Sequence, residues 1–188
     1  AVSRAENNTI EKKTITLAHP AQVGMGQPFA VRLTSSRTFD RLSVKWMGKK
    51  FVPSVSQWKN RHVAIVMLGS DVLAAKPGRQ ALKVSAWTGG TETAWQRSIR
   101  ITDRAYPRQE LTLPSKMVSP PPSELKRIKA ESARARKAKT TWTDQRWWQL
   151  PFYRPVEGKI TSAYGLQRVL NGKPNKPHRG LDLRAPTG

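Results

Sequence analysis

A histidine and an aspartate near the end of the printed sequence, His178 and Asp182, have the clearest capacity for chemistry. They lie four positions apart, with a glycine between them and Ala-Pro-Thr-Gly shortly after them. From a strand or a bulged turn, both side chains can reach one ion. An imidazole nitrogen and a carboxylate oxygen both suit Zn²⁺, with a position left open for water or substrate. Taken alone, this spacing is more often a surface histidine and a solvated aspartate, so the flanking residues decide.

The flanking residues form a longer pattern. Gly158 is followed by K-I-T-S-A-Y-G, then Arg168, then Asn171-Gly172, and then P-H-R-G-L-D-L-R-A-P-T-G, which contains both candidate ligands. This string resembles the opening of the LytM/lysostaphin (M23-type) metallopeptidase domain. The pattern of that family is G-x-(I/V)-T-S-x-(F/Y)-G, R, N-G and H-x-G-x-D-(I/L/F)-x-A-P-x-G. Every element occurs here in the same order, over about Pro151 to Gly188.

The resemblance implies a zinc-dependent endopeptidase that cleaves peptide bonds in the stem or cross-bridge of peptidoglycan. By position, His178 and Asp182 match two of the family's three zinc ligands. Arg168 and Asn171 lie in the segment that lines the approach to the substrate groove, and we expect them to position substrate. Other residues match turn and packing positions: Tyr164 (where phenylalanine is common), Gly165, Gly172, Gly180 and Gly188.

The zinc site that the resemblance implies is incomplete in this sequence. The family's third ligand and its catalytic histidine come from an H-x-H motif farther along, so no catalytic residue is assigned here and they are expected downstream of Gly188. The other histidines are His19, expected in a loop because it precedes a proline, and His62, expected to pack in an apolar strand. Two ligands hold zinc weakly and no base is available to activate water. We therefore expect the 188-residue chain to be inactive by itself.

The elements that would position these residues begin with a β-rich domain over residues 1–105. Short runs rich in β-branched and aromatic residues, bounded by Gly, Pro, Asp or Ser, predict six strands. They are Thr14–Leu17, Phe29–Leu33, Leu42–Trp46, His62–Met67, Ala81–Trp87 and Trp95–Ile101. The spacing is typical of an immunoglobulin-like β-sandwich, although a small antiparallel barrel fits nearly as well. Gly89-Gly90 predicts a hairpin turn. We expect four tryptophans to pack in the core or on a sheet face rather than bind sugar: Trp46, Trp58, Trp87 and Trp95.

Two further segments follow in a mainly β chain. Residues 106–146 are a proline-rich linker and a basic helix, predicted to begin with Ser123 as its N-cap and to run to about Lys139. Its basic residues leave only a thin apolar stripe, so we expect a solvated helix that is docked at one end and connects two domains. Residues 147–188 are predicted to be the first strands of an antiparallel β-sheet metallopeptidase domain, which is incomplete.

The charge balance indicates an anionic partner. Lysine and arginine number 34 against 12 acidic residues, a net charge of +22, and such a field speeds encounter with anions. A nucleic-acid-binding module would use the basic helix and Trp142, Trp147 or Trp148, but no recognised motif supports it and nucleic acid is not expected. A non-catalytic wall-binding or regulatory protein with a degenerate peptidase scaffold is the other alternative. The expected partner is peptidoglycan.

The cysteine content, the apolar runs and the first residue bear on where the protein is located. The sequence has no cysteine, which excludes a disulfide framework and a thiolate zinc site. No apolar run is long enough to cross a bilayer, so no transmembrane segment is expected. The first residue is Ala1, as in a mature end left by signal-peptide removal or in a trimmed chain. Together with the resemblance, this predicts a periplasmic or secreted protein of the cell envelope.

Overall fold

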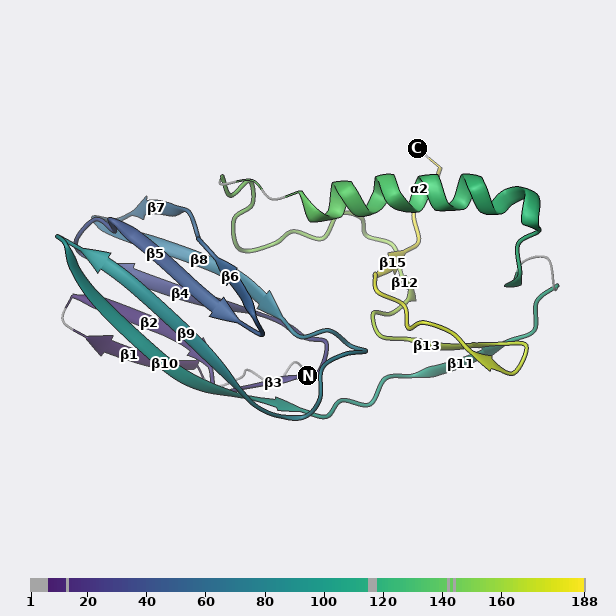
Figure 1. The fold of residues 1–188 in the computed structure, drawn as a ribbon, viewed down its shortest axis with the longest axis horizontal. Coiled ribbons are helices and arrows are strands. Elements are labelled where there is room, and N and C mark those ends of the chain that lie inside the picture. The colour runs from purple at the N-terminus through teal and green to yellow at the C-terminus, as the bar shows by residue number, and fades with distance from the viewer. Residues whose placement is uncertain (1–6, 13, 115–117, 142, 144, 188) are drawn as a thin grey trace. The chain divides into compact units, whose positions relative to one another are not determined.

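The computed structural model describes residues 7–12, 14–114, 118–141, 143 and 145–187. It is a mainly β protein with several sheets and one long helix (Figure 1). The chain divides into two compact units. The first comprises Ala1–Ala105 with Asp144–Trp148, and the second comprises Tyr106–Thr143 with Gln149–Gly188.

The first unit consists of two five-stranded sheets. One sheet has the order β1 (Asn7–Lys12), β2 (Ile15–Pro20), β4 (Pro28–Ser35), β8 (Arg61–Gly69) and β7 (Val55–Trp58). The other has the order β3 (Gln22–Gly24), β10 (Thr91–Thr102), β9 (Gly78–Thr88), β5 (Arg41–Trp46) and β6 (Lys49–Phe51). Neighbouring strands are antiparallel, except that β3 pairs with β10 in parallel.

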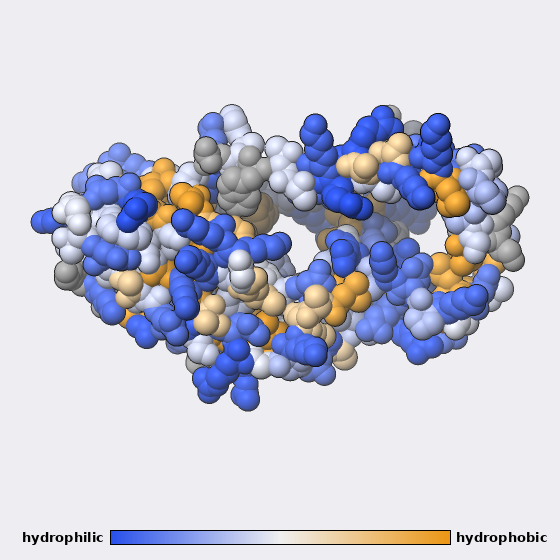
Figure 2. All heavy atoms as spheres, viewed as in Figure 1, coloured by the Kyte–Doolittle hydropathy of each residue, from blue (hydrophilic) through white to orange (hydrophobic). Residues whose placement is uncertain are grey.

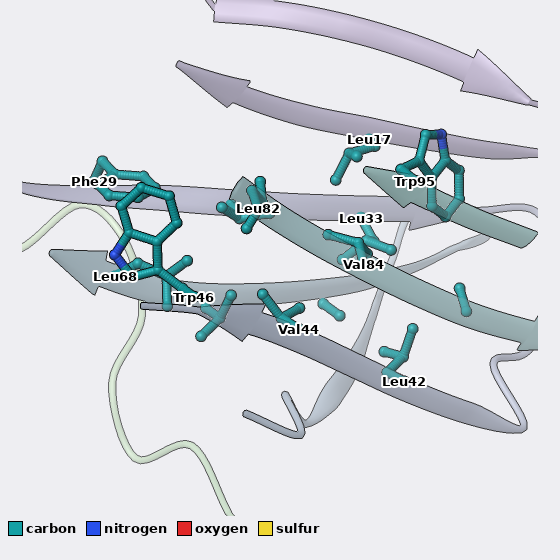
Figure 3. Close-up of a cluster of buried hydrophobic side chains, with 14 of the residues drawn as sticks. Leu17, Phe29, Leu33, Leu42, Val44, Trp46, Leu68, Leu82, Val84 and Trp95 are labelled. Carbon is teal, nitrogen blue, oxygen red and sulfur yellow. The ribbon is translucent and has the colours of Figure 1, made fainter. Parts of the chain in front are cut away.

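Both sheets bury one face in a shared core. Along β5, for example, Leu42, Val44 and Trp46 are buried while the residues between them are more exposed, because successive side chains of a strand point to opposite faces. Figure 3 shows side chains of both sheets in this cluster, including Leu33 of β4 and Leu82 of β9. Two separate sheets around one core make this unit a β-sandwich rather than the closed barrel that the sequence also allowed.

The six predicted strands of this unit are its central strands. They correspond to β2, β4, β5, β8, β9 and β10. The hairpin turn between β9 and β10 also forms at Gly89 and Gly90, both with positive φ. The strands that the sequence did not predict, β1, β3, β6 and β7, all lie at sheet edges. An edge strand is held mainly by backbone pairing on one side, so it needs little hydrophobic alternation for a pattern to detect.

The structure corrects the prediction for His19. It lies in β2 rather than in a loop and is only 2% exposed, because its position shares the inward face with Ile15 and Leu17. The proline after it ends the strand instead of preventing it. His62 lies in β8 as predicted, half-buried, with its Nε2 3.3 Å from the hydroxyl of Thr38.

The tryptophans of this unit differ in burial. Trp46 and Trp95 are core residues, each 3% exposed, and Trp46 donates a hydrogen bond of 2.8 Å to the carbonyl of Gly69. Trp87 is half-buried on the outer sheet face. The packing prediction is wrong for Trp58, which is 64% exposed because it lies on the edge strand β7. Trp142 lies outside the described residues.

The second unit contains the helix α2 (Pro122–Thr140). It begins two residues earlier than predicted, since its N-cap is Pro121 rather than Ser123, and a proline stands in its first turn. No residue of the helix is buried, and the predicted solvated helix is confirmed. Its visible side carries mainly hydrophilic residues (Figure 2). The Arg127 guanidinium donates hydrogen bonds to the carboxylates of Glu124 and Glu131, and these bonds, that to Glu124 first, raise the pKa of Arg127 above its ordinary value.

Two small sheets complete the second unit. One has the order β11 (Arg108–Leu111), β13 (Gln167–Leu170) and β14 (Lys173–Pro174), and β11 pairs with β13 in parallel. The other joins β12 (Ile160–Ser162) to β15 (Asp182–Leu183) in antiparallel fashion. The first strand of residues 147–188 therefore begins at Ile160. Among the described residues, no helix is long and apolar enough to span a membrane.

Candidate metal centre

The pairing of β12 with β15 positions Asp182, one of the two candidate ligands. Ser162 and Asp182 are opposite each other, with an irregularity in register between Ile160 and Ser162. Residues directly opposite in an antiparallel pair have neighbouring Cβ atoms. Asp182 therefore lies beside the end of β12, although 20 positions separate it from Ser162 in the sequence.

The backbone of His178 is fixed by a turn that follows β12. Its N–H donates to the carbonyl of Leu166 at 2.9 Å, and its carbonyl accepts from the N–H of Gly165 at 2.7 Å. Gly165 has φ of 83°, a conformation that a residue with a Cβ rarely adopts. The ring of Tyr106 also occupies the space that a Cβ of Gly165 would need. Glycine at this position therefore allows the turn that anchors His178.

The Nδ1 atom of His178 has two hydrogen-bond neighbours. It lies 3.1 Å from the carbonyl oxygen of Ala163 and 3.0 Å from the hydroxyl of Ser162. A carbonyl oxygen can only accept, so the contact with Ala163 assigns a proton to Nδ1. In the neutral ring, Nε2 then carries the lone pair, as is required of a histidine that binds a metal through Nε2.

The Nε2 atom of His178 lies 3.3 Å from Oδ1 of Asp182. In the neutral ring these are two acceptors, and two acceptors so close together need a proton or a cation between them. Zinc ligands about 2.0–2.1 Å from a tetrahedral ion are about 3.3–3.4 Å apart. The observed distance of 3.3 Å between Nε2 and Oδ1 matches this distance between ligand atoms, so the two side chains fit a shared zinc ion. It also fits a protonated histidine paired with the carboxylate.

The two candidate ligands differ in access to solvent. The side chain of His178 is 17% exposed and that of Asp182 is 55% exposed. A Cβ added at Gly180 would lie 3.4 Å from Nε2 of His178, so glycine keeps the approach to this nitrogen open. The site is therefore supported on the Nδ1 side of the ring and accessible on the Nε2 side.

Arg168 reaches the centre through Ser162. Its Nη2 donates a hydrogen bond of 2.9 Å to the Ser162 hydroxyl, which in turn contacts His178. The Nε of Arg168 is buried and has no hydrogen-bond partner among the described residues. Arg168, predicted to position substrate, thus lies on the Nδ1 side of His178 and supports the orientation of the ring through Ser162. Ser162 was not singled out from the sequence, although it stands inside the T-S pair of the motif.

Asn171 makes a different contact. It occupies the turn between β13 and β14 with φ of 50°, and Gly172 follows with φ of 75°. Its side-chain amide is hydrogen-bonded to both the N–H and the carbonyl of Leu113. Both ends of the amide are occupied by backbone, which supports a structural role for a residue predicted to position substrate.

The described residues contain no group of three or more His, Cys, Asp or Glu side chains that could hold a metal ion. The centre therefore consists of two candidate ligands and their supporting residues. His19 and His62 both belong to strands of the first unit, β2 and β8, and the structure brings neither into such a group. Gly188, expected at a packing position, lies outside the described residues.

Comparisons with known proteins provide distant structural similarities only. No family model matches the chain, and no curated protein matches it. A fragment of the ICAM-5 ectodomain, domains one to four, is similar at 18% identity with a TM-score of 0.41 over 50% of this chain. An endo-β-1,4-mannanase from Thermotoga petrophila is similar at 17% identity with a TM-score of 0.38, also over 50%. This chain spans 26% of the first and 21% of the second.

Proposed function

We propose that this chain is the front portion of a zinc-dependent peptidoglycan endopeptidase of the LytM/lysostaphin type. In this proposal, an immunoglobulin-like β-sandwich and a basic helix precede the opening of the catalytic domain. His178 and Asp182 are two of the three zinc ligands. The enzyme acts in the periplasm or outside the cell, and its substrate is a peptide bond of the cell wall.

The observation that carries the proposal is the arrangement around His178. A carbonyl oxygen holds Nδ1, and Nε2 lies 3.3 Å from a carboxylate oxygen. Outer hydrogen bonds that fix the tautomer of a ligating histidine are typical of zinc sites. The same residues stand in the H-x-G-x-D pattern that resembles the family.

The residues of this chain have defined tasks in the proposed reaction. When bound, zinc would polarise the scissile carbonyl and lower the pKa of its water. His178 and Asp182 hold the ion, while Ser162 and Ala163 keep the imidazole in the required tautomer. Arg168 orients Ser162 through its hydrogen bond of 2.9 Å. The base and the third ligand are expected from a downstream H-x-H motif, so the present chain by itself should cleave nothing.

Release of soluble muropeptides from purified cell-wall sacculi tests the proposal. The complete protein, in which an H-x-H segment follows this chain, should release them in a zinc-dependent manner. Asp182→Asn in that protein should abolish release, and the 188-residue chain should serve as the inactive control.

Two results would contradict the endopeptidase proposal. One is a complete protein without any H-x-H segment, which would favour a non-catalytic wall-binding or regulatory role. The other is release of muropeptides that survives both a chelator and Asp182→Asn, since the cleavage would then not use this centre.

A further inference from the structure

Three lysines form a row across the outer face of the sheet β3-β10-β9-β5-β6. Lys45 of β5 is directly opposite Lys50 of β6 on one side and Lys83 of β9 on the other. Residues directly opposite in an antiparallel sheet have Cβ atoms about 4.5–5.5 Å apart, and like charges there are destabilising. We call Lys45, Lys50 and Lys83 the lysine row.

The lysine row faces solvent. All three lysines are exposed, whereas Val44 and Trp46, on either side of Lys45, are buried in the core. Among the described residues, no acidic side chain forms an ion pair with a lysine of this row. The mutual repulsion of the row is therefore not neutralised within the described part of the chain.

The positive charge continues along the same face. Arg79 of β9 is opposite Arg100 of β10, and both are exposed. Arg79 is four residues from Lys83 along β9, and Arg100 is four residues from Gln96, which is opposite Lys83. Because side chains alternate between the two faces of a strand, both arginines share the face of the lysine row. The acidic residue on the outer side of these strands is Glu92, which is opposite Trp87. Glu92 is four residues along β10 from Gln96, the residue opposite Lys83, which corresponds to about 13 Å along an extended strand.

The outer face of the other sheet has a different character. Its central outward positions are mostly uncharged, with Ala30 opposite Met67 and Arg32 opposite Ile65. Arg32 is the charged residue among these central positions of β4 and β8. The exposed basic residues Lys12 and Arg61 lie at the ends of strands of this sheet, so its centre lacks the continuous row of positive charge found on the other sheet.

We propose that the outer face of the sheet β3-β10-β9-β5-β6 binds the surface of an anionic phospholipid membrane. A sheet face presents its charges over a broad surface, as contact with a bilayer requires. Lysines are compact point charges that suit a diffuse layer of phosphate headgroups. Each basic residue near such a surface increases affinity about fivefold. The repulsion within the lysine row would be relieved by the membrane charge.

Nucleic acid fits this face less well. Binding of single strands combines a positively charged groove with aromatic rings on which bases stack. The aromatic ring on the outer side of β9 belongs to Trp87, and the guanidinium carbon of Arg41 lies 3.8 Å from its centroid. That ring is therefore already covered. Reading the grooves of a duplex requires a protruding helix or ribbon, which a broad sheet face does not supply.

The test is vesicle binding by the whole chain, with no zinc present, so that its outcome is independent of the endopeptidase proposal. The probe is vesicles of phosphatidylcholine with about a third phosphatidylglycerol, compared with vesicles of phosphatidylcholine alone. The variant Lys45→Gln/Lys50→Gln/Lys83→Gln should lose on the order of 100-fold in affinity, about fivefold for each lysine. Binding should also weaken steeply with salt.

A matched control removes the same charge from the other sheet and its hairpin. The variant Arg32→Gln/Lys59→Gln/Arg61→Gln loses three exposed basic residues of the same unit, and it should lose less than fivefold. Thermal melts verify that both variants are folded, and the lysine-row variant should melt no lower than the native protein because repulsion is relieved.

Three outcomes would overturn the inference. Equal losses in the two triple variants would mean that only net charge matters. Failure of the native chain to bind the anionic vesicles at low salt would exclude a membrane surface. Tighter binding of a single-stranded 30-nucleotide DNA than of vesicles at the same salt, lost in the lysine-row variant, would assign the face to nucleic acid.

Discussion

The side-chain amide of Asn171 is hydrogen-bonded to both backbone groups of Leu113, 58 residues earlier in the chain, at 2.8 and 2.9 Å. This contact continues the parallel pairing of β11 with β13, where Leu111 is opposite Leu170. The segment that follows the β-sandwich is therefore held to the strand that carries Arg168. Through Arg168 and Ser162, the same strand supports the candidate metal centre.

Asn171→Ala should destabilise the second unit by about 2–4 kcal/mol. The substitution removes both hydrogen bonds to Leu113, and alanine has no side-chain amide to stabilise the positive φ at this position. Asn171→Gly tolerates the positive φ and should cost less, which isolates the amide contribution. Hydrogen exchange at the N–H of Leu113 is the readout. Unchanged protection of that N–H in both variants would contradict the structural role of Asn171.

His178→Ala and Asp182→Asn should each reduce the affinity of the chain for Zn²⁺ severely, because a single remaining ligand cannot hold the ion. Competition titration with a chromogenic zinc indicator measures the affinity. His62→Ala, which removes a histidine from the first unit, is the control and should leave the affinity unchanged. A result in which His62→Ala has the larger effect would place the zinc elsewhere.

Ser162→Ala should weaken zinc binding about 10- to 100-fold, the effect typical of losing an outer partner of a ligating histidine. Its neighbour Thr161 provides the matched control, since its hydroxyl donates to the backbone carbonyl of Asp182 and not to the imidazole. Thr161→Ala should therefore change the affinity much less. Equal effects of the two substitutions would remove Ser162 from the set of positioning residues.

Gly165→Ala should destabilise the second unit more than Gly172→Ala. Both glycines have positive φ, 83° and 75°, so both substitutions carry a backbone strain of about 1–2 kcal/mol. Only at Gly165 does the new methyl group meet a neighbour, the ring of Tyr106, whereas the space at Gly172 is open. Crowding of this kind adds about 1–3 kcal/mol. Denaturant unfolding measures both, and Tyr106→Ala in the Gly165→Ala background should recover part of the difference.

Trp46→Ala should cost about 3–5 kcal/mol of unfolding free energy, as is usual for a buried tryptophan. The residue is 3% exposed and contacts Phe29 edge-to-face at 5.2 Å between ring centroids. Trp58→Ala is the control, and at 64% exposure it should change stability by less than about 0.5 kcal/mol. A large effect at Trp58 would show that β7 is more important for the sheet than its edge position indicates.

Hydrophobic alternation was sufficient to predict the central strands. β4, β5, β8 and β9 each bury alternate residues in the core, and that alternation is visible in the sequence because the core demands it. The edge strands were not predicted because each adds few residues to the core, such as Val23 of β3 and Phe51 of β6, and is otherwise held by backbone pairing. Trp46 and Trp58 illustrate the difference: the sequence assigned both to packing, and only the position of each strand within its sheet separates them.

The sequence by itself also determined the candidate ligands, since His178 and Asp182 are four positions apart and local geometry can bring them to one ion. Only the tertiary structure decided what surrounds them. Ser162 and Ala163 contact Nδ1 of His178 from 16 and 15 positions away, and Asn171 holds Leu113 across 58. Such contacts depend on strand register and on turns at Gly165 and Gly172, which arise from the packing of the whole unit. Residue type limits what a side chain can bind, and the fold determines which partner it reaches.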